Sequence, residues 1–258
     1  YNAGRATLLG NLNGYDSLVT LESFGDFRNT LDKDDLDYFN VDPIKPEQVK
    51  TAEIGYRAVV FRRLYFDANY YFSYYTNFIG YKFGLDLDFP PVGNVPQNID
   101  AYRIAANTKD AVSTQGFSIG LNYYLNNHLA LNGNYTYNVL NKRGSTDPII
   151  PAFNTPVNKF NLGFTGRDYE FGNYKDGKLG FAINFKWIEG FIFEGSPQFT
   201  GAIPSYYLLD AQVSYKIVPW KTTFKLGASN ITDNQQFQVY GGPYVGRLAY
   251  ASITIDIN

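Results

Sequence analysis

Hydrophobic residues recur at every second position over most of the chain. Between 116 and 125, for example, Phe117, Ile119, Leu121 and Tyr123 alternate with glycine, serine, asparagine and a second tyrosine. Successive side chains of a β-strand point to opposite faces, so this pattern predicts strands with one apolar face and one small or polar face. About nine antiparallel strands are predicted. They span 48–61, 63–83, 109–126, 128–143, 158–172, 178–196, 204–217, 222–240 and 246–258.

Short and long connections alternate between these strands. Tight links are predicted at 62–63, 126–128, 173–177 and 218–221, and longer ones at 84–108, 144–157, 197–203 and 241–245. This alternation is typical of outer-membrane barrels, which have short periplasmic turns and longer extracellular loops. The last strand then ends in the periplasm. Residues 1–47 are predicted to be an extracellular loop region, with a helical turn or two within 15–40, that leads into the barrel strands of 48–258.

Alternation alone does not distinguish a membrane barrel from a soluble sandwich, because either can carry one apolar and one polar face. Three features favour a membrane barrel, in which the apolar face contacts lipid. The predicted strand 63–83 is far longer than the usual strand of about six residues, aromatic residues gather at strand ends, and nine uncovered strands would leave open edges unless the sheet closed. The predicted fold class is therefore an all-β transmembrane barrel, and the odd strand count predicts part of a larger one.

Composition narrows the classes of function. The 258 residues contain 22 Lys and Arg against 24 Asp and Glu, a net charge of −2 that argues against a nucleic-acid partner. The chain has no Cys, which excludes disulfides and thiolate chemistry. It also has no Met, so we expect a processed chain or a segment of a longer one. Unbroken hydrophobic runs stop at four residues, whereas a membrane-spanning helix needs about 20.

Three motifs suggest chemistry, and structural roles explain them better. The G-x-x-x-x-G-K pattern at 172–178 lacks the required Ser or Thr and precedes a strand, so a hairpin turn is expected. The acidic run 32–37 lacks the EF-hand glycine and final acid, which favours a solvated loop over a loose calcium site. His128 is the only histidine and lies in a tight turn, without the partners that catalysis needs. We therefore expect no enzyme activity, metal or cofactor.

Two further sets of residues are candidates for contacts with a solute. The first set follows the polar face of the strands, where a wet barrel would pair its charges in side-chain ladders, and contacts to a solute are the less favoured role. It comprises Glu53, Arg57, Asp67, Asn69, Lys186, Asp210, Lys216, Lys225 and Asp256. The second set is the outer-loop aromatics, whose rings can stack on sugars or peptides and equally suit packing or the interfacial girdle. It comprises Tyr81, Phe83, Phe89, Tyr102, Phe153, Phe199, Tyr240 and Tyr244.

Several stretches, in order along the chain, resemble the TonB-dependent outer-membrane receptors. KPEQVKTAEIGYR at 45–57 resembles the entry into a late barrel strand of that family, and NTKD at 107–110 before Gln115 also fits. LGASNITD at 226–233 resembles the penultimate strand, where a G..NL.D pattern ends the sheet. The stretch 240–247 and the alternation over 250–257 resemble the last loop and closing strand.

The resemblance implies a 22-stranded outer-membrane barrel with an N-terminal plug, opened by periplasmic TonB to import scarce nutrients. The plug and the TonB-binding segment are not in this sequence, so the TonB energising complex is a partner by resemblance only, through a region outside the chain. A surface lipoprotein partner is compatible with the same resemblance. Many outer-membrane barrels end in an aromatic residue, whereas this chain ends in Ile257 and Asn258.

The expected function is therefore the wall and extracellular mouth of an import channel in the bacterial outer membrane. Three alternatives remain at this point: a passive porin-like barrel, a structural barrel subunit of an envelope complex, and a soluble all-β binding module. The side-chain directions of two adjacent residues test the membrane prediction, because Leu121 should contact lipid while Asn122 faces the lumen.

Overall fold

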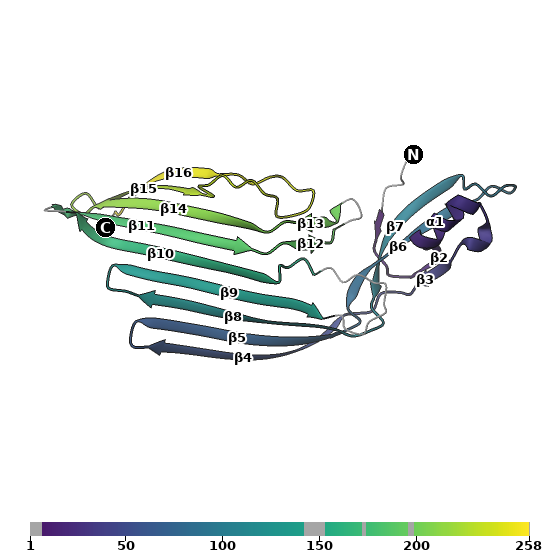
Figure 1. Ribbon diagram of the computed structural model, residues 1–258, viewed down its shortest axis with the longest axis horizontal. Coiled ribbons are helices and arrows are strands. Elements are labelled where there is room, and N and C mark those ends of the chain that lie inside the picture. The colour runs from purple at the N-terminus through teal and green to yellow at the C-terminus, as the bar shows by residue number, and fades with distance from the viewer. Residues whose placement is uncertain (1–6, 142–152, 172–173, 196–198, 258) are drawn as a thin grey trace.

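The computed structural model describes residues 7–141, 153–171, 174–195 and 199–257. Within them, the largest element is a nine-stranded antiparallel sheet, so the predicted fold class and strand count are confirmed. Its strands, in chain order, are β4 (Gln48–Val60), β5 (Leu64–Thr76), β8 (Val112–Tyr124), β9 (Leu129–Asn141), β10 (Asn158–Phe171), β11 (Tyr174–Ile188), β14 (Tyr206–Ile217), β15 (Thr222–Ser229) and β16 (Leu248–Ile255). Each strand pairs with its neighbour in this order, which makes the sheet a simple meander (Figure 1).

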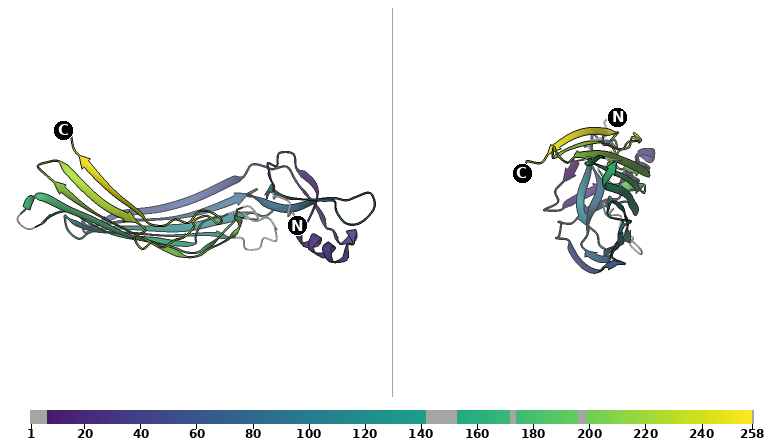
Figure 2. Two further views of the ribbon diagram at one scale, coloured as in Figure 1. Left: turned by 90° about the horizontal axis from the view of Figure 1, so that it is seen from above. Right: turned by 90° about the vertical axis from the view of Figure 1, so that its left-hand side faces the viewer.

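The sheet is curved but open (Figure 2). Its edge strands, β4 and β16, do not pair with each other. The described short turns, at 61–63, 125–128 and 218–221, lie at one end, and the C-terminus lies there too (Figure 1). The C-terminal position follows from the register, since Thr222 pairs with Ile255 directly after the last short turn.

The register confirms that the alternating pattern sorts side chains by face. One row across five strands reads Phe66, Leu121, Gly133, Leu162 and Phe185. The next row belongs to the opposite face and reads Asp67, Gly120, Asn134, Asn161 and Lys186. Neighbouring residues of each strand therefore belong to opposite faces of the sheet, one of them apolar and the other polar.

Nothing in the described residues covers the apolar face. Ile54 is 72% exposed, Leu162 57% and Leu226 60%, although all three lie on the sheet's apolar face. A soluble sandwich buries such rows against a second sheet. The arrangement is that of a barrel wall, whose apolar face meets lipid. No helix among the described residues is long and apolar enough to cross a membrane.

A second unit lies beyond the long-connection end of the sheet (Figure 1). We call residues 7–47 and 77–111 the end unit. Its elements are β1 (Thr7–Leu9), β2 (Tyr15–Val19), α1 (Leu21–Thr30), the 3-10 helix η1 (Lys33–Asp35), β3 (Tyr38–Val41), β6 (Ile79–Asp88) and β7 (Asn98–Asn107). The strands form a five-stranded sheet in the order β1-β7-β6-β2-β3, in which β1 runs parallel to β7.

The helix α1 has clear start and stop signals. The Thr20 hydroxyl accepts a hydrogen bond from the Ser23 amide (3.2 Å), which caps the first turn. Leu31 adopts a left-handed conformation (φ 56°) and its amide donates to the Phe27 carbonyl (2.7 Å), which ends the helix. The prediction of a helical turn or two within 15–40 is confirmed, and residues 7–47 are folded rather than irregular.

The predicted strand 63–83 is wrong in its length. The strand β5 ends at Thr76, and Asn77 turns the chain with a positive φ of 53°. The Asn107 side chain donates to the Asn77 carbonyl (2.7 Å), so this turn is fixed by the end of β7. The chain then enters β6 in the other sheet, which means that unusual strand length was not valid evidence for lipid. The predicted loop 84–108 likewise contains β7.

Other boundaries also differ from the prediction. The predicted strand 222–240 ends at Ser229, because Asn230 has a φ of 50° and its buried side chain bonds to both backbone groups of Asn234. The predicted strand 178–196 ends at Ile188 and is followed by a hairpin of β12 (Phe191–Phe193) and β13 (Gly201–Ile203). The predicted link 173–177 is mostly strand, since β11 begins at Tyr174.

Candidate functional site

The candidate aromatic residues all lie at the long-connection end, in or beside two separate structures. Four of them belong to the end unit. Three lie near the hairpin β12–β13, which the connection 230–247 overlies, and Phe153 lies in the connection before β10. This last connection is tied to the hairpin, since Asn154 donates to the Glu194 carbonyl (3.1 Å) and accepts from the Glu194 amide (2.7 Å).

In the end unit, the candidate rings serve mainly to pack the small sheet. Phe89 meets the Phe27 ring edge-on at 5.9 Å between centroids, and the Lys33 ammonium lies 4.3 Å from its centre. Tyr102 lies 5.3 Å from the Tyr15 ring. These contacts place Phe89 and Tyr102 beside the unit's two apolar cores rather than free in solvent.

Tyr81 and Phe83 share one face of β6 with the buried Leu85. The Arg103 guanidinium lies 3.5 Å from the centre of the Tyr81 ring, close enough for a cation–π interaction. Its Nε is buried and has no hydrogen-bond partner within the described part of the chain. Tyr81 is thus engaged with a cation of its own unit, and Phe83 is half-buried.

Burial and nearby charged groups raise the pKa of one side chain in the end unit. Burial raises the pKa of Tyr15 to about 12, and the hydrogen bond with Tyr102 and the nearby Asp86 and Asp100 act in the same direction. The carboxylates contribute because they disfavour a phenolate close to them. Tyr15 therefore stays neutral at any physiological pH and serves as a hydrogen-bonding group.

The second structure is an aromatic cluster formed by Phe199, Phe237, Tyr240 and Tyr244. The Phe237 ring contacts Tyr240 and Tyr244 edge-on, with centroids 6.0 and 5.5 Å apart. Phe199 is 51% exposed and Tyr244 67%, so this cluster offers an open aromatic surface.

Two glycines make room for the aromatic cluster. A side chain at Gly201 would collide with the Tyr240 ring, and one at Gly241 would collide with the Phe199 ring. Gly241 also has a φ of +77°, a conformation that glycine adopts without strain. The rings therefore lie directly on backbone, which holds them in place.

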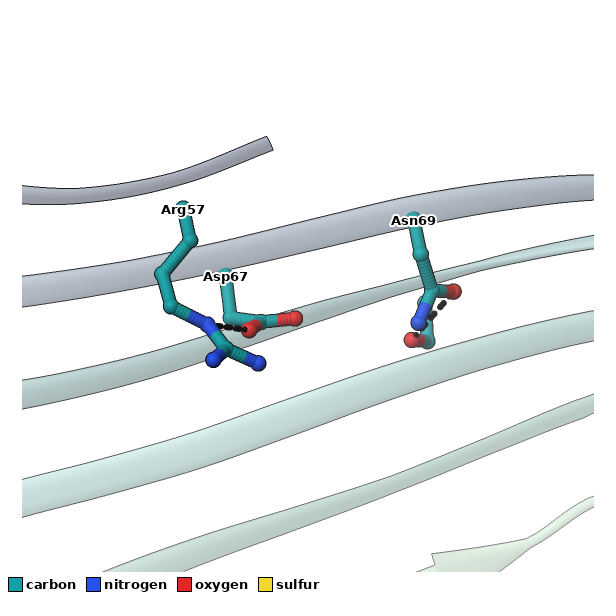
Figure 3. A network of polar contacts seen from close by, with 4 residues as sticks. Arg57, Asp67 and Asn69 are labelled. Carbon is teal, nitrogen blue, oxygen red and sulfur yellow. Dashed lines mark hydrogen bonds and ion pairs between the residues drawn. The ribbon is translucent and has the colours of Figure 1, made fainter. Parts of the chain in front are cut away.

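The polar face of the large sheet carries paired groups. The Arg57 Nε lies 2.7 Å from the Asp67 carboxylate, and the Ser118 hydroxyl donates to the Asn69 side chain at 2.8 Å (Figure 3). Near the short turns, the Lys216 ammonium lies 3.5 Å from the Asp256 carboxylate. Cross-strand pairs of this kind are the side-chain ladders expected of a wet lumen.

The family comparison decides between the architectures that fit this geometry. The model of the TonB-dependent receptor-like β-barrel matches residues 4–231, which is most of the chain. The chain belongs to the TonB-dependent receptor β-barrel family. No relative was found among proteins with curated descriptions.

Solved structures agree on the fold of this receptor segment. The copper transporter OprC is similar with a TM-score of 0.59 at 15% identity, over 82% of this chain and 31% of OprC. The FrpB iron transporter from Neisseria meningitidis gives 0.55 at 12% identity, over 83% of this chain and 32% of FrpB. The siderophore receptor PirA from Acinetobacter baumannii gives 0.54 at 17%, over 84% and 33%. The chain thus spans about a third of each protein.

The motifs set aside at the sequence level have structural roles in the receptor segment. The Asp32 carboxylate caps η1 by accepting from the Asp34 amide (3.0 Å), and Asp35 accepts from the Thr30 hydroxyl. His128 Nδ1 lies 3.0 Å from the Arg167 carbonyl oxygen. The start of the 172–178 motif lies outside the described residues, and its remainder is strand β11.

One member of the aromatic cluster was missed by the sequence reasoning. Phe237 was assigned to the interior of a strand that spanned 222–240, so it was not considered as a loop residue. The available signal was the LGASNITD motif, whose Asn and Asp both suit turns. A strand that ends at this motif would have placed Phe237 in the following connection.

Proposed function

We propose that this chain forms part of the wall and the extracellular mouth of a TonB-dependent importer in the bacterial outer membrane. The observation that carries the proposal is the asymmetry of the nine-stranded sheet. Short turns and the C-terminus lie at one end, and the end unit and the aromatic cluster lie at the other. In outer-membrane barrels the short turns are periplasmic and the elaborated connections are extracellular.

In this proposal the polar face lines the passage of the importer. Strands outside this chain pair with the open edges of β4 and β16 and close the wall, since unpaired strand edges cannot lie in lipid. The TonB energising complex acts through a region outside this chain. The end unit projects from the mouth, where a surface lipoprotein partner would dock. The segment itself positions and admits a solute and performs no bond chemistry.

The charge of the end unit bears on the class of solute. Residues 7–47 and 77–111 contain 13 Asp and Glu against 6 Lys and Arg, a net charge of −7 in a chain with a total of −2. A negative field at the mouth raises the local concentration of cations and slows the arrival of anions. We therefore propose a metal ion or a positively charged complex as the solute. The similar structures include a copper transporter and an iron transporter.

The aromatic cluster is the proposed place of contact with the organic part of such a complex. Phe199 and Tyr244 present exposed rings, Tyr244 packs on Phe237, and Phe199 lies on Gly241. Rings held against backbone lose little freedom on binding, which favours stacking on a planar ligand group. Tyr81, Phe83, Phe89, Tyr102 and Phe153 remain weaker proposals, because each is half-buried.

The topology has a direct test in cysteine labelling, since the chain contains no native Cys. Val92 in the end unit and Phe61 in a short turn are both 90% exposed and form a matched pair. In the complete receptor polypeptide, Val92→Cys should react with a membrane-impermeant maleimide on intact cells. Phe61→Cys should react only after the outer membrane is permeabilised, and the reverse pattern would overturn the proposed orientation.

Active import has a separate test. Uptake of the radiolabelled solute by cells that make the complete receptor should stop when TonB is deleted or the proton gradient is collapsed. A passive porin-like barrel predicts unchanged uptake in both conditions, and a structural subunit predicts no receptor-dependent uptake at all. A soluble binding module predicts recovery in the aqueous fraction without detergent.

A further inference from the structure

The apolar face of the large sheet contains a groove of about 430 Å³. It is centred on Gly133, which stands between Leu121 and Leu162 in a row of otherwise large side chains. Because glycine has no side chain, the row is interrupted and leaves a hollow. Leu131 and Ile183 also line it. The volume falls within the range of about 300–1,000 Å³ that is usual for ligand sites.

The groove begins at the short-turn end of the sheet. Leu64, the first residue of β5, and Tyr123, near the last residue of β8, both line it. Phe61 and Trp220 are 90% and 68% exposed in two of the short turns. Exposed aromatic residues of this kind sit at the level of lipid headgroups. The groove therefore runs from the headgroup level into the hydrocarbon.

Two arginines lie in the turn that leads into the groove-lining Leu64. Arg62 and Arg63 form the turn immediately before Leu64, and both are exposed. An Arg63 guanidinium nitrogen lies 3.4 Å from the Leu125 carbonyl, so this side chain reaches across the end of β8. Neither arginine forms an ion pair with a carboxylate of the described residues. Two guanidinium groups without an ion pair among the described residues thus belong to the turn that precedes the groove-lining Leu64.

We infer that this feature is a binding site for one anionic phospholipid of the membrane leaflet at the short turns. The headgroup phosphate accepts hydrogen bonds from Arg62 and Arg63, whose planar guanidinium groups suit phosphate oxygens. One acyl chain lies in the groove over Gly133, where it gains van der Waals contacts on several sides instead of one. The inference rests on the membrane location of the barrel and on its proposed orientation, and not on the transported solute.

The test is a lipid titration of the complete receptor, purified from outer membranes in mild detergent and followed by native mass spectrometry. Phosphatidylglycerol and phosphatidylcholine with identical acyl chains are the two probes. The unmodified receptor should bind one phosphatidylglycerol in clear preference to phosphatidylcholine. Each basic residue near a membrane surface contributes about fivefold to the affinity for anionic lipid. The double variant Arg62→Gln with Arg63→Gln should therefore weaken phosphatidylglycerol binding by about 30-fold. Phosphatidylcholine binding should change little in that variant.

Gly133→Phe tests the groove independently of charge. The new side chain fills the hollow, and its Cβ would meet the movable Leu162 side chain at 3.1 Å and the Asn161 carbonyl oxygen at an ordinary contact distance of 3.4 Å. Occupancy by both lipids should fall, whereas Leu226→Phe, on the same face but outside the groove, should leave both unchanged. The charge control is Arg167→Gln with Lys178→Gln, which removes two cations at the same end. Arg167 lines a polar-face pocket and Lys178 lies on the same face, so lipid binding should persist.

Three results would overturn the inference. Equal binding of the two lipids by the unmodified receptor would show ordinary annular lipid, and equal loss in the charge control would show a general field effect. A preference for lipopolysaccharide over phosphatidylglycerol in direct competition would assign the site to the other leaflet. The arginine variant lies in an exposed turn, so it remains informative even where Gly133→Phe impairs assembly. Transport measurements are not involved, so failure here leaves the proposed import untouched.

Discussion

The large sheet and the end unit use the same β-strand pattern in opposite ways. In the large sheet the apolar rows are exposed, as Ile54 at 72% and Leu162 at 57% illustrate. In the end unit the apolar residues are covered, with Leu18 at 0% and Ile104 at 1%. The comparison teaches that alternation reports only the existence of two unlike faces. Which solvent each face meets depends on what else packs there.

The end unit covers both faces of its own small sheet. One apolar core forms around Leu18 and Ile104, and the other forms around Phe27 and Leu85, where α1 packs. The large sheet has no such layer within the described residues, and in the proposed function its apolar face meets the bilayer. A substitution that destabilises one unit should therefore leave the other unit unaffected, because the two apolar faces are covered by different surroundings.

The largest difference between the two units is expected for Phe27→Ala, which should destabilise the end unit and not the large sheet. Phe27 is 1% exposed and anchors α1 on the end unit, so its loss should cost about 3–5 kcal/mol of that unit's stability. Limited proteolysis of intact cells should then cleave within 7–47 or 77–111. The barrel should keep the heat-modifiable mobility on SDS gels that marks a folded barrel. Loss of barrel assembly in this variant would show that the two units fold as one.

The next largest effect concerns the facing of the large sheet. Leu121→Arg places a charge on the lipid-facing row and should cost about 2–4 kcal/mol if that position lies near the bilayer midplane. Asn122→Arg is the matched control, because Asn122 pairs with Asn132 on the polar face. Folding into lipid vesicles, followed by urea titration, measures both. Equal destabilisation would contradict the assignment of the faces.

A smaller change should loosen α1 alone. Thr20→Ala removes the side chain that accepts from the Ser23 amide and should destabilise the helix by about 1 kcal/mol. Hydrogen exchange should become faster over 21–30 and stay unchanged in β8 and β9. Asn29→Ala, at an exposed helical position, is the control and should leave exchange close to that of the original chain.

The last prediction is a pH dependence confined to the end unit. The raised pKa of Tyr15, about 12 against an ordinary 10, means that the folded state holds the phenolic proton more tightly than the unfolded state. This contribution is complete below pH 10 and is lost as the pH rises towards 12. Proteolytic resistance of the end unit should therefore fall over that interval, less so in Tyr15→Phe. Equal pH dependence of both proteins would contradict the predicted shift.

Local sequence was sufficient for the number of strands in the large sheet and for their two faces. Nine strands were predicted and nine occur in the described sheet, and the split between Leu121 and Asn122 follows the register. The reason is that the period of two is imposed by backbone geometry and needs no tertiary information. The same local rule failed at 63–83, where the alternation continues through Asn77 although the chain changes sheets there.

The candidate site was predictable only as a list of aromatic residues. Sequence placed Phe199, Tyr240 and Tyr244 in outer connections, but not against one another or against Phe237. Their contact depends on Gly201 and Gly241 and on the path of two connections that are distant in sequence. Tyr102 and Phe89 were equal candidates by type, and tertiary packing places them beside the end unit's cores.

By itself, the sequence determined that this chain forms long antiparallel strands with an apolar and a polar face, because side-chain alternation is a property of the extended backbone. Only the tertiary structure decided that residues 7–47 and 77–111 leave the sheet and bury their own cores, and that Gly133 opens a groove beside Arg62 and Arg63. These outcomes depend on strand register and on contacts between distant segments, which no local pattern encodes.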